Sequence, residues 1–354
     1  MRYANRGFLQ APSESWIVPG TEAQPLAALQ PYYSTHAGHA YLGDSLAIMQ
    51  ELPDSSVNLA MTSPPFALTF KKEYGNQHQD DYVQWFCQYA SEIHRLLTDD
   101  GSFVVDLGGA WRKGSPTRSL YVYRLILALC EQIGFQLAQE FFWYRPAALP
   151  SPAEWVTVRR IRVKDAVNYI FWLSKTKHPK ADNRRVLVPY SKDMKRLIEK
   201  GYRAKQRPSG HNITAKFDRN LGGAIPSNLL ELGNNDASGT YMAACKKLGL
   251  KPHPARYPVG IPSFFISLCT ESGDLVMDPF GGSNTTGYAA QSLDRRWIAI
   301  ESHEPYLRGS TLRFPGDVLM GSGIEGAHTR LPHIEAIEPQ RQPSLFEAFP
   351  ISAD

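Results

Sequence analysis

The chain of 354 residues has few cysteines and no long apolar run. Its four cysteines, Cys87, Cys130, Cys245 and Cys269, are spaced too widely to indicate a zinc site or a small disulfide framework. We therefore expect reduced thiols and no metal site. No segment approaches the roughly 18 consecutive apolar residues of a membrane span, and the first residues lack the apolar stretch of a signal peptide. These absences predict a cytoplasmic protein that does not enter a membrane.

What the sequence does contain is an uneven distribution of charge. The whole chain has a formal net charge of +4, but residues 159–219 hold 18 Lys and Arg against 5 Asp and Glu. Such segregation favours a polyanionic partner, of which nucleic acid is the common one. A solvated basic face is the alternative. Because Tyr190, Tyr202 and Phe217 are interleaved with the basic residues, the pattern favours contact with nucleic acid.

From about Ala40 onward, strand-like and helix-like segments alternate along the chain. Strands are predicted at 56–61, 102–109, 136–144, 166–175, 274–280 and 296–301, and helices at 80–97, 119–135, 286–293 and 303–314. This alternation predicts a doubly wound α/β sheet. The basic segment has no regular period until residue 262, and we interpret it as an insertion. Residues 1–36 and 315–354 are predicted to be an irregular arm and a tail.

A glycine-rich turn, DPFGGSNTT at 278–286, joins a predicted strand to a predicted helix. Gly281 and Gly282 allow a sharp turn and the close approach of a ligand. Glu301 ends the next predicted strand, where an acid can accept both hydroxyls of an adenosine ribose. The turn does not match the phosphate-binding patterns GxxxxGK[ST] or GxGxxG. An ordinary strand–helix turn without a ligand is the alternative.

The predicted strand at 56–61 runs into a stiff turn, TSPPF at 62–66. Two prolines fix two φ angles and remove two N–H donors, which leaves rigid carbonyls. Methylation of an amino group on a base requires acceptors for its N–H groups, because the nitrogen lone pair is delocalised into the ring. The Ser63 hydroxyl and the Pro64 carbonyl are suited to accept these bonds, and Phe66 to stack on an extruded base. A surface turn is the alternative.

Two further acids follow or end predicted strands. Asp106 lies next to Gly108 and Gly109, so its carboxylate is expected at the ligand-binding edge of the sheet as a third acceptor. Asp44 in YLGDSL has the same character and is expected to face the cofactor or the mouth of the site. A purely structural helix cap is the alternative reading of Asp106, and Asp44 is equally ambiguous.

The order TSPPF, HPARYP (253–258), DPFGGSNTT resembles the β-class amino-methyltransferases of restriction–modification systems. The similarity extends from about Tyr41 to Phe314. Further stretches that carry the resemblance are SPPFAL (63–68), KKEYGN (71–76), GSFVVD (101–106), RIRVKDAVN (160–168), RPSGH (207–211) and FGGSNTTG (280–287). Several long stretches in one order are far more specific than any single motif.

The resemblance implies a Rossmann-like, circularly permuted methyltransferase fold that uses S-adenosylmethionine to methylate N4 of a flipped-out cytosine in double-stranded DNA. Its catalytic half (37–175) precedes a DNA-recognition region (176–251) and a cofactor-binding half (252–314). The implied catalytic residues are Ser63, Pro64, Pro65, Phe66 and Asp106. The implied cofactor-binding residues are Asp278, Phe280, Gly281, Gly282, Ser283, Asn284 and Glu301, and the strand-end Asp44 and the helix-start Thr285 are added as candidates from the sequence. The candidates for DNA contact are Arg159, Arg160, Arg203, Lys205, Arg207 and His211.

Within this family the resemblance further implies a cognate restriction endonuclease and the palindrome CAGCTG, methylated at its inner cytosine. A ring-carbon cytosine methyltransferase is excluded, because that chemistry typically uses a cysteine after a proline and no Pro-Cys dipeptide occurs. Methylation of adenine at N6 stays open, although Ser63 before Pro-Pro favours cytosine. An RNA substrate and a DNA-binding protein with an inactive site also stay open.

One motif near the end of the chain suggests a separate partner. QPSLF at 342–346 resembles the Gln-x-x-Leu-Phe peptides that bind the bacterial sliding clamp, with Gln342, Leu345 and Phe346 as the contacts. A chance match in a tail with two hydrophobic residues is the alternative.

Overall fold

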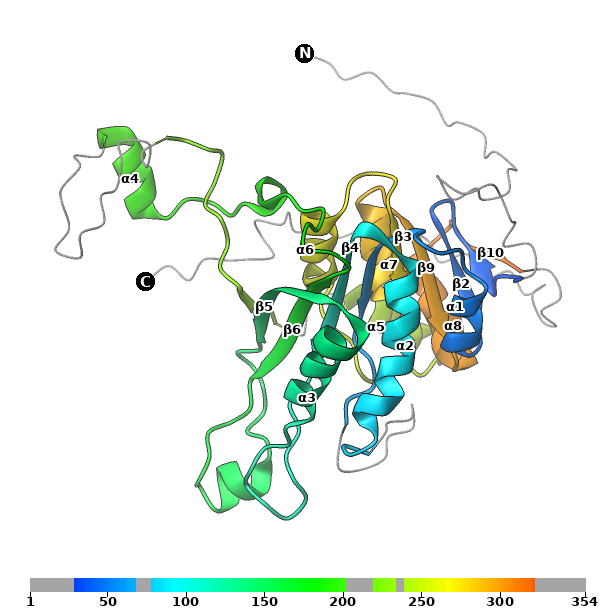
Figure 1. The fold of residues 1–354 in the computed structure, drawn as a ribbon, viewed down its shortest axis with the longest axis horizontal. Helices are drawn as coiled ribbons and strands as arrows, with labels where there is room; N and C mark the ends of the chain where they lie inside the picture. Colours follow the sequence, from blue (N-terminus) through cyan, green and yellow to red (C-terminus); the bar gives the residue numbers. More distant parts are fainter. Residues whose placement is uncertain (1–28, 68–77, 202–218, 234–238, 322–354) are drawn as a thin grey trace.

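A computed structural model of the chain describes residues 29–67, 78–201, 219–233 and 239–321. They form one large sheet with helices on both faces (Figure 1). The strands are β1 (Tyr33–Ser34), β2 (Gly38–Leu42), β3 (Val57–Thr62), β4 (Leu97–Leu107), β5 (Gln136–Tyr144), β6 (Val167–Ser174), β7 (Leu229–Glu231), β8 (Leu275–Asp278), β9 (Arg296–Glu301) and β10 (Leu319–Met320). The α-helices are α1 (Ser45–Gln50), α2 (Tyr82–Leu96), α3 (Tyr121–Ala128), α4 (Lys192–Lys200), α5 (Gly239–Lys247), α6 (Gly260–Cys269), α7 (Thr285–Ser292) and α8 (Glu304–Ser310). Shorter helical segments are η2 (Leu129–Ile133), η3 (Glu154–Val158), η4 (Asn183–Val186) and η7 (Thr311–Arg313).

The strands are arranged in the order β10-β1-β2-β9-β8-β3-β4-β6-β5-β7. From β2 to β4 the neighbours are parallel, whereas β6 is antiparallel to both β4 and β5. Parallel neighbours need a crossover connection, which α2 supplies between β3 and β4 and α7 between β8 and β9. The predicted doubly wound α/β fold is confirmed.

Each face of the sheet has its own hydrophobic core, because successive side chains of a strand point to opposite faces. On β4, Phe103 and Val105 belong to the core beneath α1, α2 and α3, whereas Val104 belongs to the core beneath α6, α7 and α8. Residues of β9 alternate in the same way, with Ile298 in the first core and Trp297 in the second. The central strands are therefore buried on both sides.

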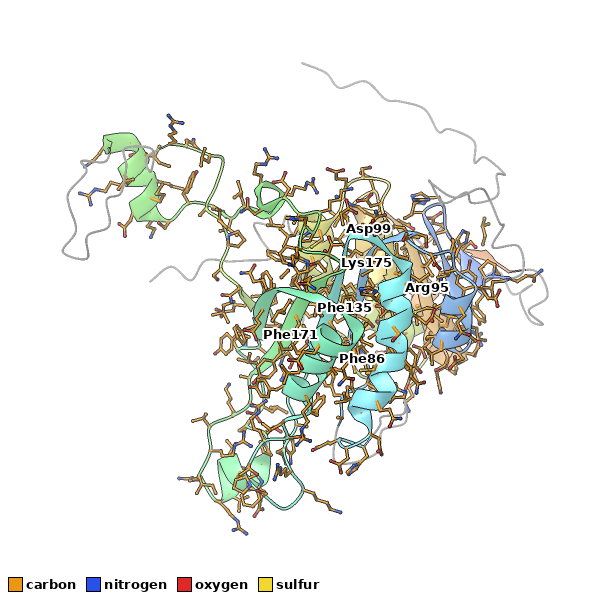
Figure 2. The ribbon with its side chains drawn as sticks, in the orientation of Figure 1. Phe86, Arg95, Asp99, Phe135, Phe171 and Lys175 are labelled. Carbon is orange, nitrogen blue, oxygen red and sulfur yellow. The ribbon has the colours of Figure 1, made fainter. Side chains whose placement is uncertain are left out.

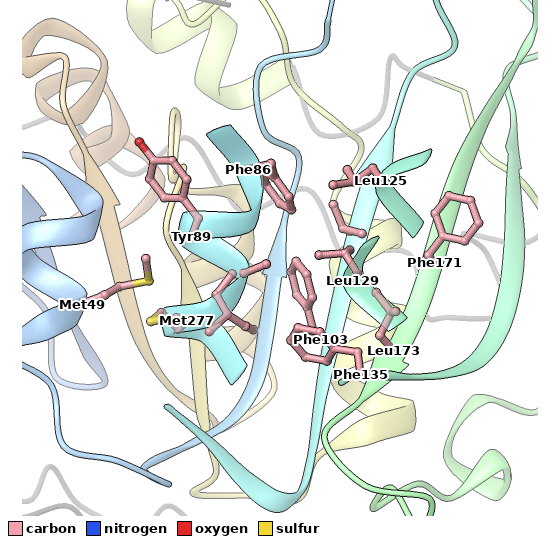
Figure 3. Close-up of a cluster of buried hydrophobic side chains, with 14 of the residues drawn as sticks. Met49, Phe86, Tyr89, Phe103, Leu125, Leu129, Phe135, Phe171, Leu173 and Met277 are labelled. Atoms are coloured by element: carbon pink, nitrogen blue, oxygen red, sulfur yellow. The ribbon is translucent and has the colours of Figure 1, made fainter. Parts of the chain in front are cut away.

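Aromatic and aliphatic side chains fill the first core (Figure 3). The ring of Phe103 lies 6.3 Å from that of Phe86 on α2 and 5.5 Å from that of Phe135, measured between centroids. Leu125 and Leu129, on α3 and η2, are fully buried in the same cluster. Burying a side chain of this size contributes about 1.5–3 kcal/mol, so this core holds the helices of this face on the sheet.

Most predicted elements are present with small shifts of their ends, but three predictions of irregular structure are wrong. Residues 33–34 and 319–320 pair as edge strands, β1 and β10, although both lie in ranges predicted to be irregular. Helix α4 lies in the basic segment and buries none of its residues, so no apolar period indicated it. Its start is instead marked by Ser191, whose hydroxyl accepts a hydrogen bond from the Met194 amide at 3.1 Å.

Part of the basic segment lies at the amino edge of the sheet, the edge at which the parallel strands begin. Lys175 follows β6 there and lies 3.9 Å from the Asp99 carboxylate (Figure 2). Lys180 forms a 2.8 Å ion pair with Asp274, just before β8. Helix α4 projects from the body of the protein beyond this segment (Figure 1). Within the described residues, no helix is both long and apolar enough to cross a membrane.

The pairing of β2 with β9 requires a glycine at position 38. A Cβ atom there would lie 2.3 Å from the Trp297 ring and 2.4 Å from its carbonyl oxygen. We expect Gly38→Ala to lower the free energy of unfolding by about 1–3 kcal/mol, because the strands must move apart. Urea unfolding measures this, with Gly233→Ala as the control because its Cβ meets open space. Equal midpoints for the two variants would contradict the close approach.

Candidate active site

The carboxyl edge of the sheet, where the parallel strands end, carries a cavity of about 400 Å³. This volume lies within the range of about 300–1,000 Å³ that is usual for ligand pockets. Predicted residues from both halves of the chain line it: Ser63, Pro64, Pro65, Phe66, Asp278, Phe280, Gly281, Gly282, Ser283, Thr285 and Glu301. The two motifs are adjacent because β3, which ends at the proline turn, pairs directly with β8, which ends at the glycine turn.

At the proline turn, Ser63 begins a hydrogen-bonded chain that continues through Asp106 on β4 to Asn168 on β6. Its Oγ donates a 2.9 Å hydrogen bond to Oδ2 of Asp106 on β4. Asn168 on β6 donates to Oδ1 of the same carboxylate at 3.1 Å. Asp106 is 2% exposed and does not line the cavity, so its carboxylate lies behind Ser63. The carboxylate is therefore joined to the cavity through the Ser63 hydroxyl, and its role as a third acceptor stays a prediction.

Burial raises the pKa of Asp106 to about 6. The hydrogen bonds from Ser63 and Asn168 and the positive charge of Arg145 work against this rise. The raised pKa follows because a low-dielectric surrounding disfavours the charged form of a carboxyl group. A carboxyl group with a pKa this close to neutrality can accept a proton and release it again.

The ring of Phe66 closes the proline-turn side of the cavity. It packs against the backbone of Gly108, where a Cβ atom would lie 2.4 Å from the ring. Only a residue without a side chain allows this approach. Gly108 thus fixes the position of Phe66, and an apolar ring at the cavity wall is a surface on which a planar base can stack.

Asp278 connects the proline turn to the glycine turn. Its Oδ1 accepts hydrogen bonds from Thr62 Oγ1 at 2.7 Å and from the Phe280 amide at 3.0 Å. Its Oδ2 accepts from Thr286 Oγ1 at 2.5 Å and from the Tyr257 hydroxyl at 3.3 Å. Burial raises the pKa of this carboxyl group, and the four donors oppose that rise. The number of donors indicates an ionised acid that holds the two turns together.

The glycine turn brings backbone amides and one acid together at the other side of the cavity. The Gly282 amide donates to Glu301 Oε2 at 2.8 Å, and the His303 amide donates to Oε1 at 2.8 Å. Gly282 has a φ of +53°, which a residue with a side chain rarely adopts. Burial raises the pKa of Glu301, and the two amides partly offset this. The carboxylate keeps free lone pairs for a ligand hydroxyl.

Two residues that sequence reasoning did not single out support the glycine turn from behind. Tyr33 on β1 accepts a 2.9 Å hydrogen bond from Asn284 Nδ2. Arg313 is 7% exposed and donates to the Ser283 carbonyl at 2.5 Å and to Ser283 Oγ at 3.0 Å. Neither contact has a sequence signal, since each partner lies about 30 or more positions away in the chain.

Sequence reasoning from local motifs also missed one wall of the cavity. The missed lining residues are Trp85, Tyr89, His253, Ala255, Arg256, Tyr257 and Ser302. The Phe280 ring packs 5.8 Å from Trp85 and 4.9 Å from Tyr89, both on α2. Both aromatic residues lie in the helix predicted at 80–97, and no local motif distinguishes them from core side chains. HPARYP was noted as a shared motif, but its residues were not assigned to the site.

Some of the predicted residues do not reach the cavity. Asp44 caps α1 by accepting a 3.0 Å hydrogen bond from the Ala47 amide. Asn284 is fully buried, with a φ of +51°, and caps α7 through the Gly287 amide. Both side chains therefore have structural partners, and neither lines the cavity.

The candidates for DNA contact and clamp binding fall into two groups. Arg159 and Arg160 are exposed beyond the carboxyl ends of the strands, between β5 and β6. The remaining candidates lie outside the described residues: Arg203, Lys205, Arg207, His211, Gln342, Leu345 and Phe346.

An open α/β sheet with a glycine turn, an acid and a pocket at its carboxyl edge is the arrangement of the Rossmann-like, ligand-binding class of proteins. The chain belongs to the DNA methylase family, whose pattern matches residues 57–312. It is 48% identical to the type II methyltransferase M.PvuII of Proteus hauseri over 87% of this chain and 93% of that protein. M.ScaI of Streptomyces caespitosus is 27% identical over 78% of this chain and 81% of that protein.

A solved structure shares both the fold and the sequence. The PvuII DNA methyltransferase (cytosine-N4-specific) superposes with a TM-score of 0.67 and 45% identity, covering 81% of this chain and 89% of that one. The resemblance to amino-methyltransferases of restriction–modification systems is confirmed. The residues of the cavity accordingly fit S-adenosylmethionine, because an acid, a glycine turn and an aromatic wall are the groups that a nucleoside with a charged tail requires.

A substitution at Glu301 tests whether this acid contributes to cofactor binding. We expect Glu301→Gln to weaken binding of S-adenosylmethionine by about ten- to a hundredfold, since hydrogen bonds to a charged group contribute about 1.5–3 kcal/mol. Isothermal titration calorimetry measures the dissociation constant, and Glu51→Gln, at an exposed site after α1, is the matched control. Equal affinities in the two variants would show that Glu301 serves only the turn.

Proposed function

We propose that this chain is a site-specific DNA methyltransferase that transfers a methyl group from S-adenosylmethionine to N4 of a flipped-out cytosine. The observation that carries the proposal is the single cavity shared by the Ser63–Phe66 turn and the Gly281–Glu301 region. A transfer between two bound molecules requires both binding surfaces within one enclosure.

The cofactor side of the cavity would be formed by the glycine turn and the aromatic wall. Glu301 is placed to accept hydrogen bonds from ribose hydroxyls, and Phe280, Trp85 and Tyr89 form an apolar surface. When bound, S-adenosylmethionine supplies a methyl group that is already activated on a sulfonium. The chain itself then has to orient the acceptor nitrogen and remove its proton.

Ser63 and Asp106 are suited to that second task. The Ser63 proton is donated to Asp106, so the lone pairs of Oγ are free to accept a hydrogen bond from the amine. The Pro64 carbonyl supplies the second acceptor. As the amine loses its proton to Oγ, the Ser63 proton passes to the Asp106 carboxylate, whose pKa of about 6 suits this exchange. Phe66 stacks on the base and holds it in place.

Cytosine is proposed as the target on two grounds. Ser63 precedes the prolines, and the relative of known structure is described as cytosine-N4-specific. By the same resemblance we propose CAGCTG as the recognition site, a cognate restriction endonuclease as the functional partner, and a cytoplasmic location with the DNA. The QPSLF segment is proposed to bind the sliding clamp through Gln342, Leu345 and Phe346.

The proposed division of the chain assigns DNA recognition to residues 176–251, between the catalytic half (37–175) and the cofactor half (252–314), with an arm at 1–36 and a tail at 315–354. Arg203, Lys205, Arg207 and His211 are its proposed contacts with DNA. Arg159 and Arg160 are proposed as contacts from the catalytic half.

The proposed transfer of a proton from the amine through Ser63 to Asp106 makes two predictions. Variants at these residues should be slower, and the rate of methylation should depend on pH. Ser63→Ala and Asp106→Ala should each lower turnover by at least about tenfold, as expected for groups that act in the transition state. In the wild type the rate should fall as the pH drops below about 6, because Asp106 is then protonated and accepts no proton. Single-turnover rates between pH 5 and 8 measure this.

Asp106→Asn is the matched variant for the pH profile, since it keeps the shape of the side chain without a titrating group. The rate of this variant should be lower than that of the wild type, and it should not decrease near pH 6. Near-normal rates in both alanine variants, or an unchanged fall in Asp106→Asn, would place the proton acceptor elsewhere.

The function itself is tested by incubating the enzyme with labelled S-adenosylmethionine and a mixed library of DNA duplexes. We expect label on cytosine N4 within one short sequence, CAGCTG. Label on adenine would change the target, and label on RNA alone would change the substrate class. No transfer, together with weak cofactor binding, would indicate a DNA-binding protein with an inactive site.

A further inference from the structure

A lobe at residues 145–166, which we call the β5–β6 lobe, extends from the carboxyl edge of the sheet (Figure 1). Its base is closed by a 2.8 Å hydrogen bond from the Arg145 amide to the Ala166 carbonyl. The same β6 strand carries Asn168, which donates to the Asp106 carboxylate. The lobe therefore begins and ends beside the catalytic turn.

The β5–β6 lobe is held together by polar contacts. Asp165 accepts hydrogen bonds from Arg118 at 2.9 Å and from Arg162 at 3.1 Å. Lys164 Nζ donates to the carbonyls of Pro146 and Ala148 at 3.1 and 3.2 Å. The shape of the lobe is thus fixed by its own contacts and by those to Arg118.

Large aliphatic side chains are nevertheless exposed on this ordered lobe. Leu149 is 81% exposed and Val163 is 85% exposed, and Val158 and Ile161 are exposed by 70% and 60%. All four belong to residues 149–163, and large apolar side chains gathered on an exposed segment are typical of contact sites.

The charged residues near these side chains in the sequence favour a polyanionic partner. The lobe carries Arg and Lys at five positions against Glu154 and Asp165, and the adjacent loop at 108–120 has three more cations and no acid. Arg159 and Arg160 are exposed and stand between Val158 and Ile161 in the chain. Arg159 lies over the Trp155 ring and pairs with Glu154 at 2.8 Å at the surface, where water or a phosphate can compete for it. A surface that combines exposed aliphatic groups with an excess of positive charge fits a polyanion with stacked apolar rings.

We propose that the β5–β6 lobe contacts the DNA duplex beside the extruded cytosine, with Leu149 and Val163 against the base pairs and Arg159 and Arg160 at the phosphates. This inference rests on the proposed function. A flipped base stays covalently attached to its strand, so the duplex must lie against the edge of the sheet that carries the cavity. An apolar wedge at that position fills part of the space that the extruded base leaves and so favours the flipped state.

The test compares Leu149→Ser/Val163→Ser with Leu319→Ser, a change at an aliphatic side chain that is 73% exposed on the distant edge strand β10. Two duplexes are used, one with the target cytosine paired to guanine and one with it opposite an abasic site. We expect the double variant to lose at least about tenfold in kcat/KM on the paired target and less than about threefold on the unpaired one, because extrusion of an unpaired base costs little. The control variant should match the wild type on both.

A second arm measures binding of the duplex by fluorescence anisotropy at several salt concentrations. Arg159→Gln/Arg160→Gln should bind more weakly and reduce the slope of log K against log salt by about one to two, one for each lost phosphate contact. Affinity for S-adenosylmethionine should stay unchanged in every variant.

Equal losses of kcat/KM on the two duplexes, no loss at all, or an unchanged salt slope would overturn the proposal. A wild type that self-associates through this surface, with the serine variant monomeric in sedimentation, would assign the apolar face to a second copy of the chain and also overturn it. If the wild type methylates neither duplex, the proposed function fails, and the anisotropy arm still decides whether the lobe binds DNA.

Discussion

The site depends on two neighbouring strands, β3 and β8, whose carboxyl ends are joined by a hydrogen bond from Thr62 to Asp278. The donor ends β3 and the acceptor ends β8, and the two residues are 216 positions apart in the chain. Because these strands are parallel neighbours, the proline turn and the glycine turn emerge side by side. In open α/β sheets ligands bind outside the carboxyl ends of the strands, and this pairing is what places both turns around one cavity.

Three acids lie at this edge, and they differ in their hydrogen-bond partners. Asp278 accepts four hydrogen bonds and serves as a fixed link between strands. Glu301 accepts two backbone amides and keeps capacity for ligand hydroxyls. Asp106 accepts from Ser63 and Asn168, and burial brings its pKa to about 6. Burial raises all three pKa values, and the hydrogen-bond donors around each carboxylate oppose that rise.

The basic segment shows that the net charge of a stretch of sequence does not give the charge of any one face of the protein. Residues 175–185 run along the amino edge, where Lys180 pairs with Asp274 and Arg185 with Glu271 at 2.7 Å. Those cations neutralise acids of the protein itself and face away from the cavity. Arg159, in the same stretch of sequence, lies beyond the opposite edge, where it pairs with Glu154 at 2.8 Å. Among the described residues, cations of this stretch therefore lie at both edges of the sheet, because β6 runs from one edge to the other.

Local chemistry alone predicted the alternation of strands and helices, the glycine turn with its acid one strand later, and the stiff turn at Ser63. These features depend on side-chain periodicity and backbone freedom within a few neighbouring residues. Tertiary structure decided that Asp106 lies behind Ser63 and does not enter the cavity, that Trp85 faces the glycine turn, and that Arg313 and Tyr33 support it. Those arrangements depend on strand order and on contacts between residues far apart in the chain, which no local pattern encodes.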